Sequence, residues 1–361
     1  MSSETNRREF IFKSLRTGAA LAAISPLLSG CSTLDEYLFE DSFFLKDKVL
    51  IVGGGLGGLY LAHRLQFNKV GLRLFEGSSR MGGRVQSIKQ IDYGASIFSG
   101  DDQILRSLLK EFDMATTQLD KSHFYLPGGM QELIDRLVEQ ISGLIVYRSI
   151  RLRWKVISVQ RIKQFHEVVF ETPRGRRTVI VRKLALAIPP SQWSRIHGLD
   201  EIPEMKSALT WASSLRKENT IKVILTTEQQ FVSNAPFKSL NYFEDDNLQA
   251  RQIFKKVKGT SWLELDFKSV QPGASIEIVR INDFIRKKMN INFTTAKMAG
   301  ENYFDWNAVD LIQGSAFTSP LVFPEIKSGT FQIVGDFASP LKPQSLEGAL
   351  QSAARSAEFL T

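Results

Sequence analysis

Cysteine and histidine are both scarce in this chain of 361 residues, which contains one cysteine and four histidines. A single thiol cannot close an intramolecular disulfide, so a disulfide-stapled scaffold is excluded. The histidines are His63, His123, His166 and His197, and their spacing matches no set of metal ligands. We therefore predict no metal site.

Long apolar runs and dense basic patches are also missing. A weakly apolar stretch, residues 18–28, is interrupted by Pro26 and is too short to span a bilayer as a helix. The net charge is +8, but the basic residues are not clustered among aromatics, so nucleic acid is not an expected partner. The hydrophobic content of 43% is enough for two domains, each with its own core.

A glycine cluster between an apolar run and a helical pattern is the most informative feature present. Residues 48–52 predict a buried strand, and residues 59–65 predict a helix. Gly53 and Gly55 permit a sharp turn and a close approach of backbone N–H groups to a pyrophosphate, and Gly58 lets the helix pack on the strand. The alternative is an ordinary structural turn. The predicted nucleotide-binding residues here are Gly53, Gly55, Leu56, Gly57 and Gly58.

The next predicted strand, residues 71–75, ends in Glu76. An acidic residue at this distance from the glycine cluster is typical of a carboxylate that binds the ribose hydroxyls of a dinucleotide. Glu76 therefore supports a nucleotide site over a structural turn.

A second glycine pair follows at Gly82 and Gly83, and Arg84 comes directly after it. The pair can bring backbone amides to the other side of a pyrophosphate, and the arginine can neutralise its charge. A solvated basic loop is the alternative. With Glu76 and Arg80, this run resembles the E-x-x-x-R-x-G-G-R motif of the FAD-dependent amine oxidase superfamily. That superfamily includes monoamine and polyamine oxidases, protoporphyrinogen oxidase and carotenoid desaturases such as phytoene desaturase.

Five further segments resemble the superfamily in its own order, so that the resemblance covers about residues 47–361. These segments are 91–97, 126–130, 153–159, 184–190 and 331–353. The resemblance implies that the backbone of Ala95, Ser96 and Ile97 passes near the flavin, and that Val156 contacts the adenine.

The C-terminal segment is expected to hold the flavin end of the cofactor. Asp336, after Gly335, can accept hydrogen bonds from ribityl hydroxyls. Ser345 is a candidate N-cap for a helix beginning at Leu346. The positive end of that helix would favour the anionic reduced flavin. A surface helix docked on the sheet is the alternative.

These features predict an α/β fold: a three-layer ββα FAD/NAD(P)-binding (Rossmann-like) domain with an inserted α+β substrate domain. We assign residues 47–98, 141–195 and 326–361 to the FAD-binding domain. Residues 99–140 and 196–325 are assigned to the substrate domain. Within it, the polar and basic stretch 241–261 is expected to be a solvated loop or helix.

Lys222 is the one catalytic candidate. Residues 219–226 alternate like a strand, and Lys222 matches the lysine that holds a water against flavin N5 in amine oxidases. A lysine in solvent at the edge of a strand is an equally good interpretation. Ser345 occupies the position at which amine oxidases usually carry an aromatic, which weakens the case for an amine substrate.

The resemblance implies an FAD-dependent oxidoreductase that removes a hydride equivalent from a small-molecule amine or hydrophobic substrate at flavin N5. Oxygen or a membrane electron carrier would accept the electrons. A desaturase- or protoporphyrinogen-oxidase-like enzyme and a non-catalytic FAD-binding envelope lipoprotein remain alternatives. FAD should be noncovalent, because the sole cysteine, Cys31, lies far outside these motifs.

The N-terminal segment is expected to be a targeting signal and not part of the fold. Arg7 and Arg8 followed by Phe10 resemble a twin-arginine export signal, and residues 28–31, which end at Cys31, resemble a lipobox. We expect an export signal over 1–30, a tether over 31–46 and a lipid on Cys31 that attaches the protein to the membrane. The protein would then be an exported, periplasm-facing lipoprotein of the cell envelope. The twin-arginine route carries folded proteins, which suits a chain that must bind FAD before export.

Overall fold

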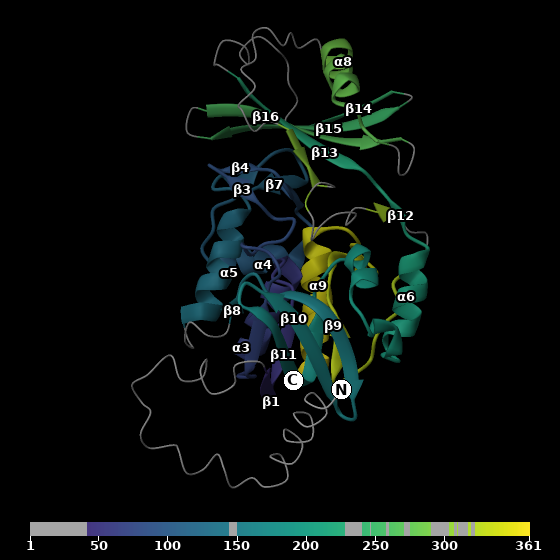
Figure 1. Cartoon of the computed structure of the whole chain (residues 1–361). Helices are drawn as coiled ribbons and strands as arrows, with labels where there is room; N and C mark the ends of the chain where they lie inside the picture. Colours follow the sequence, from purple (N-terminus) through teal and green to yellow (C-terminus); the bar gives the residue numbers. More distant parts are fainter. Residues whose placement is uncertain are drawn as a thin grey trace. The chain divides into compact units, whose positions relative to one another are not determined.

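The computed structural model describes residues 42–143, 150–227, 240–245, 247–257, 260–270, 275–289, 303–306, 309, 317–318 and 322–361 (Figure 1). The predicted export signal and Cys31 lie outside the described residues. Within the described part, no helix is both long enough and apolar enough to cross a membrane. Residues 43–361 belong to one compact unit.

The larger sheet combines a parallel half with an antiparallel meander. In the described part of the chain it has the order β8–β2–β1–β11–β10–β9, and β19 also pairs with β11. Its parallel pairs are β1 with β2, β2 with β8 and β11 with β19, whereas β9, β10 and β11 pair antiparallel. The strands are β1 (Ser42–Val52), β2 (Leu72–Phe75), β8 (Ile150–Arg151), β9 (Lys155–Ile162), β10 (Phe165–Thr172), β11 (Gly175–Leu186) and β19 (Phe331–Ile333).

Strand β1 is buried on both faces, which explains its continuous apolar sequence. Val49 and Ile51 point into a core formed with the helices, and Leu50 and Val52 point into a second core beneath the meander. The helices of the first core are α3 (Leu56–Phe67), α4 (Gln103–Glu111), α5 (Gln131–Gly143) and α9 (Leu346–Leu360). The second core also contains residues of η1 (Pro190–Arg195), η2 (Leu199–Glu201) and α6 (Met205–Ser213).

Helices α4 and α5 lie within the segment 99–140, which the sequence-based division placed in the substrate domain. Their apolar residues pack in the same core as α3 and α9. Glu347 at the start of α9 also accepts hydrogen bonds from the backbone N–H groups of Ile104 and Leu105, at 3.1 and 2.9 Å. A carboxylate there supplies partners for donors that the first turn of α4 cannot satisfy internally. These two helices thus share one core with α3 and α9, which lie in segments that the sequence-based division assigned to the FAD-binding domain.

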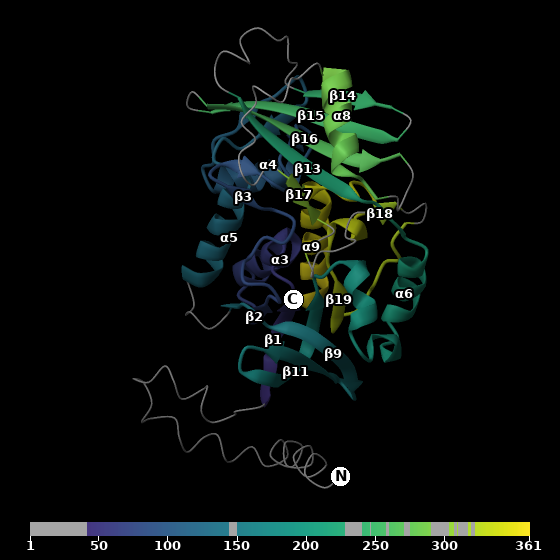
Figure 2. The same cartoon turned by 45° about the horizontal axis from the view of Figure 1, so that its top comes forward.

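The smaller main sheet is antiparallel and has the order β14–β15–β16–β13–β17 in the described residues (Figure 2). Its strands are β13 (Thr220–Thr227), β14 (Leu240–Glu244), β15 (Leu248–Val257), β16 (Thr260–Ser269) and β17 (Tyr303–Asp305). One face is apolar and packs against α8 (Ile278–Met289). The remaining short elements are β3 (Ser87–Ile88), β4 (Ile91–Asp92), β5 (Phe98–Ser99), β6 (Thr117–Gln118), β7 (His123–Tyr125), β12 (Arg216–Lys217), β18 (Phe317–Thr318) and η4 (Asp336–Ala338).

The expectation of a solvated loop or helix over 241–261 is wrong. Most of this stretch forms β14, β15 and the start of β16. Alternate residues such as Leu248 and Ala250 enter the core under α8. The polar residues between them therefore share the opposite face of the sheet, as the two-residue period of a strand requires.

Candidate functional site

A cavity of about 1340 Å³ runs between the carboxyl ends of the parallel strands and the polar face of the smaller sheet. Ordinary small-molecule pockets measure about 300–1,000 Å³, so this one has room for a dinucleotide. Every residue predicted from the sequence to bind the cofactor lines it, as does Lys222. The set is Gly53, Gly55, Leu56, Gly57, Gly58, Glu76, Gly82, Gly83, Arg84, Ala95, Ser96, Ile97, Val156, Gly335, Asp336 and Leu346.

Three glycines of the first motif have three different roles. Gly53 has a φ of +111°, and a Cβ there would overlap the carbonyl oxygen of Ala187. A Cβ on Gly58 would overlap the carbonyl oxygen of Gly53, so this glycine permits close packing of α3 on the turn. A Cβ on Gly55 would meet nothing within 4 Å. Gly55 is therefore required by neither the backbone nor the packing, and its missing side chain leaves space on the cavity wall.

The N-terminus of α3 opens into that space. Gly55 is the N-cap, and no side chain caps the helix. The N–H groups of the first turn, from Leu56 to Gly58, are thus available to a ligand at the positive end of the helix. This arrangement suits a pyrophosphate.

Glu76 follows β2 and accepts hydrogen bonds from the first glycine motif and from its own loop. Its Oε2 accepts a hydrogen bond from the Gly54 N–H at 2.6 Å, and its Oε1 accepts one from the Ser78 N–H at 2.7 Å. A carboxylate oxygen can accept a second hydrogen bond. Glu76 is therefore held rigidly on the cavity wall while retaining acceptor capacity for a hydroxyl.

Arg80, to which the sequence assigned no separate role, organises the second glycine pair. Its guanidinium donates to the carbonyl oxygens of Gly83 at 2.5 Å and Val85 at 3.0 Å. Gly82 and Gly83 both have positive φ angles, at 109° and 57°. The Arg80 side chain therefore stabilises a loop conformation that only glycine adopts readily at these two positions.

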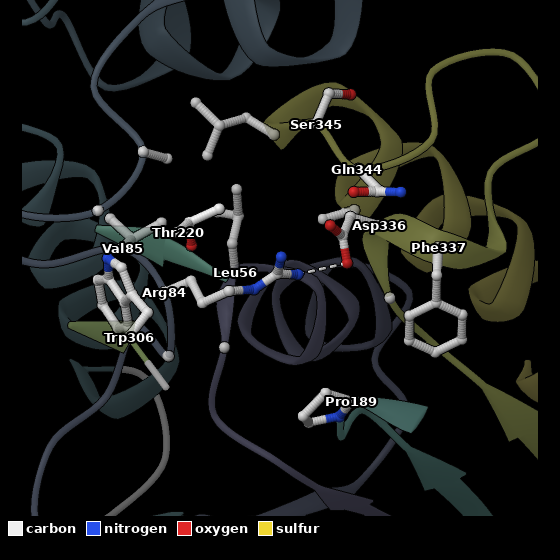
Figure 3. Close-up of a pocket in the computed structure, with 18 of the residues that line it drawn as sticks. Leu56, Arg84, Val85, Pro189, Thr220, Trp306, Asp336, Phe337, Gln344 and Ser345 are labelled. Carbon is white, nitrogen blue, oxygen red and sulfur yellow. Dashed lines mark hydrogen bonds and ion pairs between the residues drawn. The ribbon is translucent and has the colours of Figure 1, made fainter. Parts of the chain in front are cut away.

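Arg84 and Asp336 lie 252 positions apart in sequence and form an ion pair at 2.5 Å inside the cavity (Figure 3). The sequence assigned them separately, Arg84 to the pyrophosphate and Asp336 to ribityl hydroxyls. In the structure each is the partner of the other, which joins the N-terminal and C-terminal motifs on one wall.

The predicted N-cap at Ser345 is confirmed. Its Oγ accepts a hydrogen bond from the Gly348 N–H at 2.9 Å, and α9 begins at Leu346. Ser345, Leu346 and Gln344 line the cavity, so the positive end of α9 borders it (Figure 3).

Lys222 is buried, and the interpretation as a solvent-exposed edge lysine is wrong. Strand β13 lies between β16 and β17, and the Lys222 side chain is 3% exposed. Its Nζ donates to the carbonyl oxygen of Gly94 at 2.9 Å and forms ion pairs with Asp266 at 3.1 Å and Glu264 at 3.3 Å. The ammonium is therefore fixed beside the cavity-lining segment 94–97.

Several known structures share this fold. A triple mutant of putrescine oxidase has a TM-score of 0.71 at 14% identity, over 88% of this chain and 99% of that one. Wild-type putrescine oxidase bound to putrescine has a TM-score of 0.68 at 15% identity, over 88% and 99%. Cyclohexylamine oxidase from Brevibacterium oxydans has a TM-score of 0.68 at 13% identity, over 87% and 99%. No curated protein matches the sequence.

Two family models match the sequence itself. The model for an NAD(P)-binding Rossmann-like domain matches residues 51–112, and the model for a flavin containing amine oxidoreductase matches residues 114–269. The chain is an FAD-dependent oxidoreductase, and its residues 114–269 are similar to the flavin containing amine oxidoreductases. The predicted α/β fold with a Rossmann-like domain is confirmed, as is FAD as the cofactor.

The cavity of this flavin oxidoreductase fits FAD in chemical character. The uncapped first turn of α3 and the open position at Gly55 suit a pyrophosphate, and Glu76 suits a ribose. The Arg84–Asp336 pair can exchange part of its mutual contact for polar groups of the cofactor.

Buried charges behind Lys222 are the part of the enzyme that the sequence missed. Lys255 is 1% exposed and pairs with Asp92 at 2.7 Å and Glu264 at 2.9 Å. Burial alone would lower the pKa of Lys255, but the carboxylates of Glu264 and Asp92 outweigh it and raise the pKa. Burial likewise acts to raise the pKa of Glu264, but Lys255 and Lys222 lower it overall. Glu264 is therefore a carboxylate, and Lys255 an ammonium, at neutral pH.

Aromatic side chains from several elements line the cavity, among them Tyr242, Trp306 and Phe337. Trp306 lines the cavity (Figure 3), and its Nε1 donates to the carbonyl oxygen of Tyr93 at 2.9 Å. Phe304 packs edge-on against Trp306, with ring centroids 4.7 Å apart. Where α9 begins, the lining residues are Gln344 and Ser345, with Asp336 and Phe337 of η4 beside them (Figure 3).

Proposed function

We propose that this enzyme oxidises a small-molecule amine with oxygen as the electron acceptor. The observation that carries the proposal is Lys222, whose ammonium is fixed on the cavity wall beside the segment predicted to face the flavin. Putrescine oxidase and cyclohexylamine oxidase, which share the fold, are amine oxidases by name, and this supports the substrate class. A desaturase-like activity on a hydrophobic substrate is the second candidate, because Ser345 stands where an amine oxidase would carry an aromatic.

When bound, FAD would accept a hydride equivalent at its N5 atom. The chain supplies the environment. The first turn of α3 would hold the pyrophosphate, Glu76 a ribose, and the N-terminal end of α9 would favour negative charge on the ring system. Lys222 would hold a water near the cofactor and stabilise negative charge that develops on oxygen. Trp306 and Ile221 would exclude bulk water from the substrate end.

We expect the purified enzyme to carry FAD that acid precipitation releases into the supernatant, because no cysteine lies near the cavity motifs. Addition of amines from a structurally varied panel should bleach the flavin and release hydrogen peroxide in air. Bleaching without peroxide would favour a membrane carrier as acceptor. No reduction by any amine, combined with reduction by a polyunsaturated substrate, would favour the desaturase-like activity. Chromophore that stays in the pellet would show covalent attachment.

A non-catalytic flavoprotein is separated from both enzymes by a further measurement. Photoreduced flavin in the purified protein should reoxidise rapidly in air if the cavity supports turnover. Persistent reduced flavin and no response to any substrate would indicate a purely structural cofactor.

We further propose export by the twin-arginine route and lipidation at Cys31, on the strength of residues 7–10 and 28–31. Replacing Arg7 and Arg8 with lysine should leave the precursor in the cytoplasm. In cells fed labelled palmitate, the wild-type protein should acquire label and Cys31→Ser should not. Label that persists in the serine variant would contradict the lipobox. Lipoproteins carry several acyl chains, so membrane attachment should be stable to high salt.

A further inference from the structure

We infer that Glu264 and Lys255 are positioning residues that fix Lys222 and the cofactor-lining segment 94–96 from behind. The two lysines and the carboxylate between them form a buried clamp, here called the lysine clamp (Lys222, Glu264 and Lys255). Its effect on FAD binding is independent of which substrate the enzyme oxidises. Its effect on Lys222 during turnover rests on the proposed function.

Glu264 joins the two ammonium groups. It projects from β16 and is fully buried, with Oε2 at 3.3 Å from Lys222 Nζ and Oε1 at 2.9 Å from Lys255 Nζ. The indole N–H of Trp262 donates to the same Oε1 at 3.1 Å. The carboxylate is therefore held from three directions, and it fixes the position of both lysines.

Both lysines converge on one short piece of backbone. Lys222 Nζ donates to the carbonyl oxygen of Gly94 at 2.9 Å, and Lys255 Nζ donates to that of Ser96 at 3.3 Å. Lys255 also pairs with Asp92, just before this segment. The smaller sheet thus grips the backbone of 92–96 by charged hydrogen bonds, which are stronger than neutral ones.

The gripped segment is also tied to the pyrophosphate loop. The Ala95 N–H donates to the carbonyl oxygen of Arg84 at 3.2 Å, and Gly94 packs so closely against Arg84 that a Cβ there would overlap its carbonyl oxygen. Displacement of residues 94–96 would consequently move the loop that carries Gly83 and Arg84. The lysine clamp is in this way connected to the cofactor cavity through two successive contacts.

Fold stability alone does not account for these charges. With Asp92, Arg251 and Asp266, the cluster contains three basic and three acidic side chains, and its formal net charge is zero. Asp92 comes from β4, and the other five come from the polar face of the smaller sheet. Burying charged groups costs desolvation energy, and well-packed apolar residues usually stabilise a core as well as ion pairs do. What the ions add is a defined position for an ammonium on the cavity wall.

The test is FAD affinity of the apoprotein, measured by titration with FAD and quenching of flavin fluorescence. In Glu264→Gln the amide keeps the shape and a hydrogen-bond acceptor but loses the charge that holds both lysines. We expect the FAD dissociation constant to rise about tenfold or more, the scale of a charged hydrogen bond. The matched control is Glu204→Gln. This change breaks an ion pair away from the cavity, in which Glu204 Oε1 lies 2.9 Å from Arg161 Nη1. It should leave FAD affinity unchanged.

The charge-neutral double variant Glu264→Gln/Lys255→Gln keeps the test decisive if the single variant does not fold. It removes one negative and one positive charge together, and Asp92 keeps its hydrogen bonds from the Ser87 hydroxyl and the Met130 N–H. Its apoprotein should therefore fold, while FAD affinity still falls about tenfold. Under the proposed function, reoxidation of its reduced flavin should also slow. Wild-type FAD affinity in a folded double variant would overturn the lysine clamp, whatever the substrate proves to be. If the double variant bound FAD weakly but the wild type oxidised no amine, the lysine clamp would be supported and the proposed function contradicted.

Discussion

Lys222→Met is expected to slow reoxidation of the reduced flavin by oxygen about 10²–10³-fold, the usual loss for removal of one preorganised charge-stabilising group. Methionine keeps the length and apolar packing of the lysine stem while deleting the ammonium. Stopped-flow mixing of reduced protein with oxygenated buffer measures the effect. Anaerobic reduction by substrate should change little, because the proposed role of Lys222 begins after hydride transfer.

The structure indicates that this variant will fold. Without Lys222, Glu264 still has Lys255 as a partner, and Asp266 still has Arg251 at 2.6 Å. Lys183→Met is a suitable control, since Lys183 binds the carbonyl oxygen of Leu360 at 2.6 Å, away from the cavity. If the Lys222→Met protein reoxidised at the wild-type rate, Lys222 would have a positioning role alone. The enzyme would then resemble the desaturase branch, which does without this lysine.

Gly55→Ser is expected to leave the apoprotein as stable as wild type, or more so, and to weaken FAD binding about tenfold to a hundredfold. Gly55 has φ −69° and ψ 176°, which any residue adopts, and a Cβ there meets nothing within 4 Å. Serine is a preferred N-cap, and its hydroxyl would accept from the N–H groups at the start of α3. Those are the donors that a pyrophosphate needs, so the side chain and the cofactor compete for them.

Two companion variants separate the possible causes. Gly55→Ala fills the same space without offering an acceptor, and a smaller loss of FAD affinity than in Gly55→Ser would identify the competition for donors. Gly58→Ala should instead destabilise the apoprotein by about 1–3 kcal/mol, because its Cβ overlaps the Gly53 carbonyl oxygen. Thermal melts of the apoproteins and FAD titrations provide both measurements. Unchanged FAD affinity in Gly55→Ser would place the pyrophosphate elsewhere.

Elements with local signals could be predicted from the amino-acid sequence. The apolar run before Gly53 predicts β1 because a strand buried on both faces needs no alternation. Ser345 predicts the start of α9 because its hydroxyl can cap a helix within three residues. The alternation of apolar and polar residues around Lys222 predicts β13, because successive side chains of a strand point to opposite faces. The glycine spacing and Glu76 also predict residues that line one cavity, because the strand–turn–helix unit carries its own binding geometry.

The tertiary structure alone decided which polar groups meet. In β16, Leu263, Leu265 and Phe267 alternate with Trp262, Glu264 and Asp266, a pattern that normally indicates one buried face and one solvated face. This charged face is buried because the segment 92–96 packs against it, and the two-residue period of the strand does not reveal that contact. The pairing of Arg84 with Asp336 likewise requires two distant segments to converge. A side chain's period shows which face it occupies, whereas what covers that face depends on residues far away in the chain.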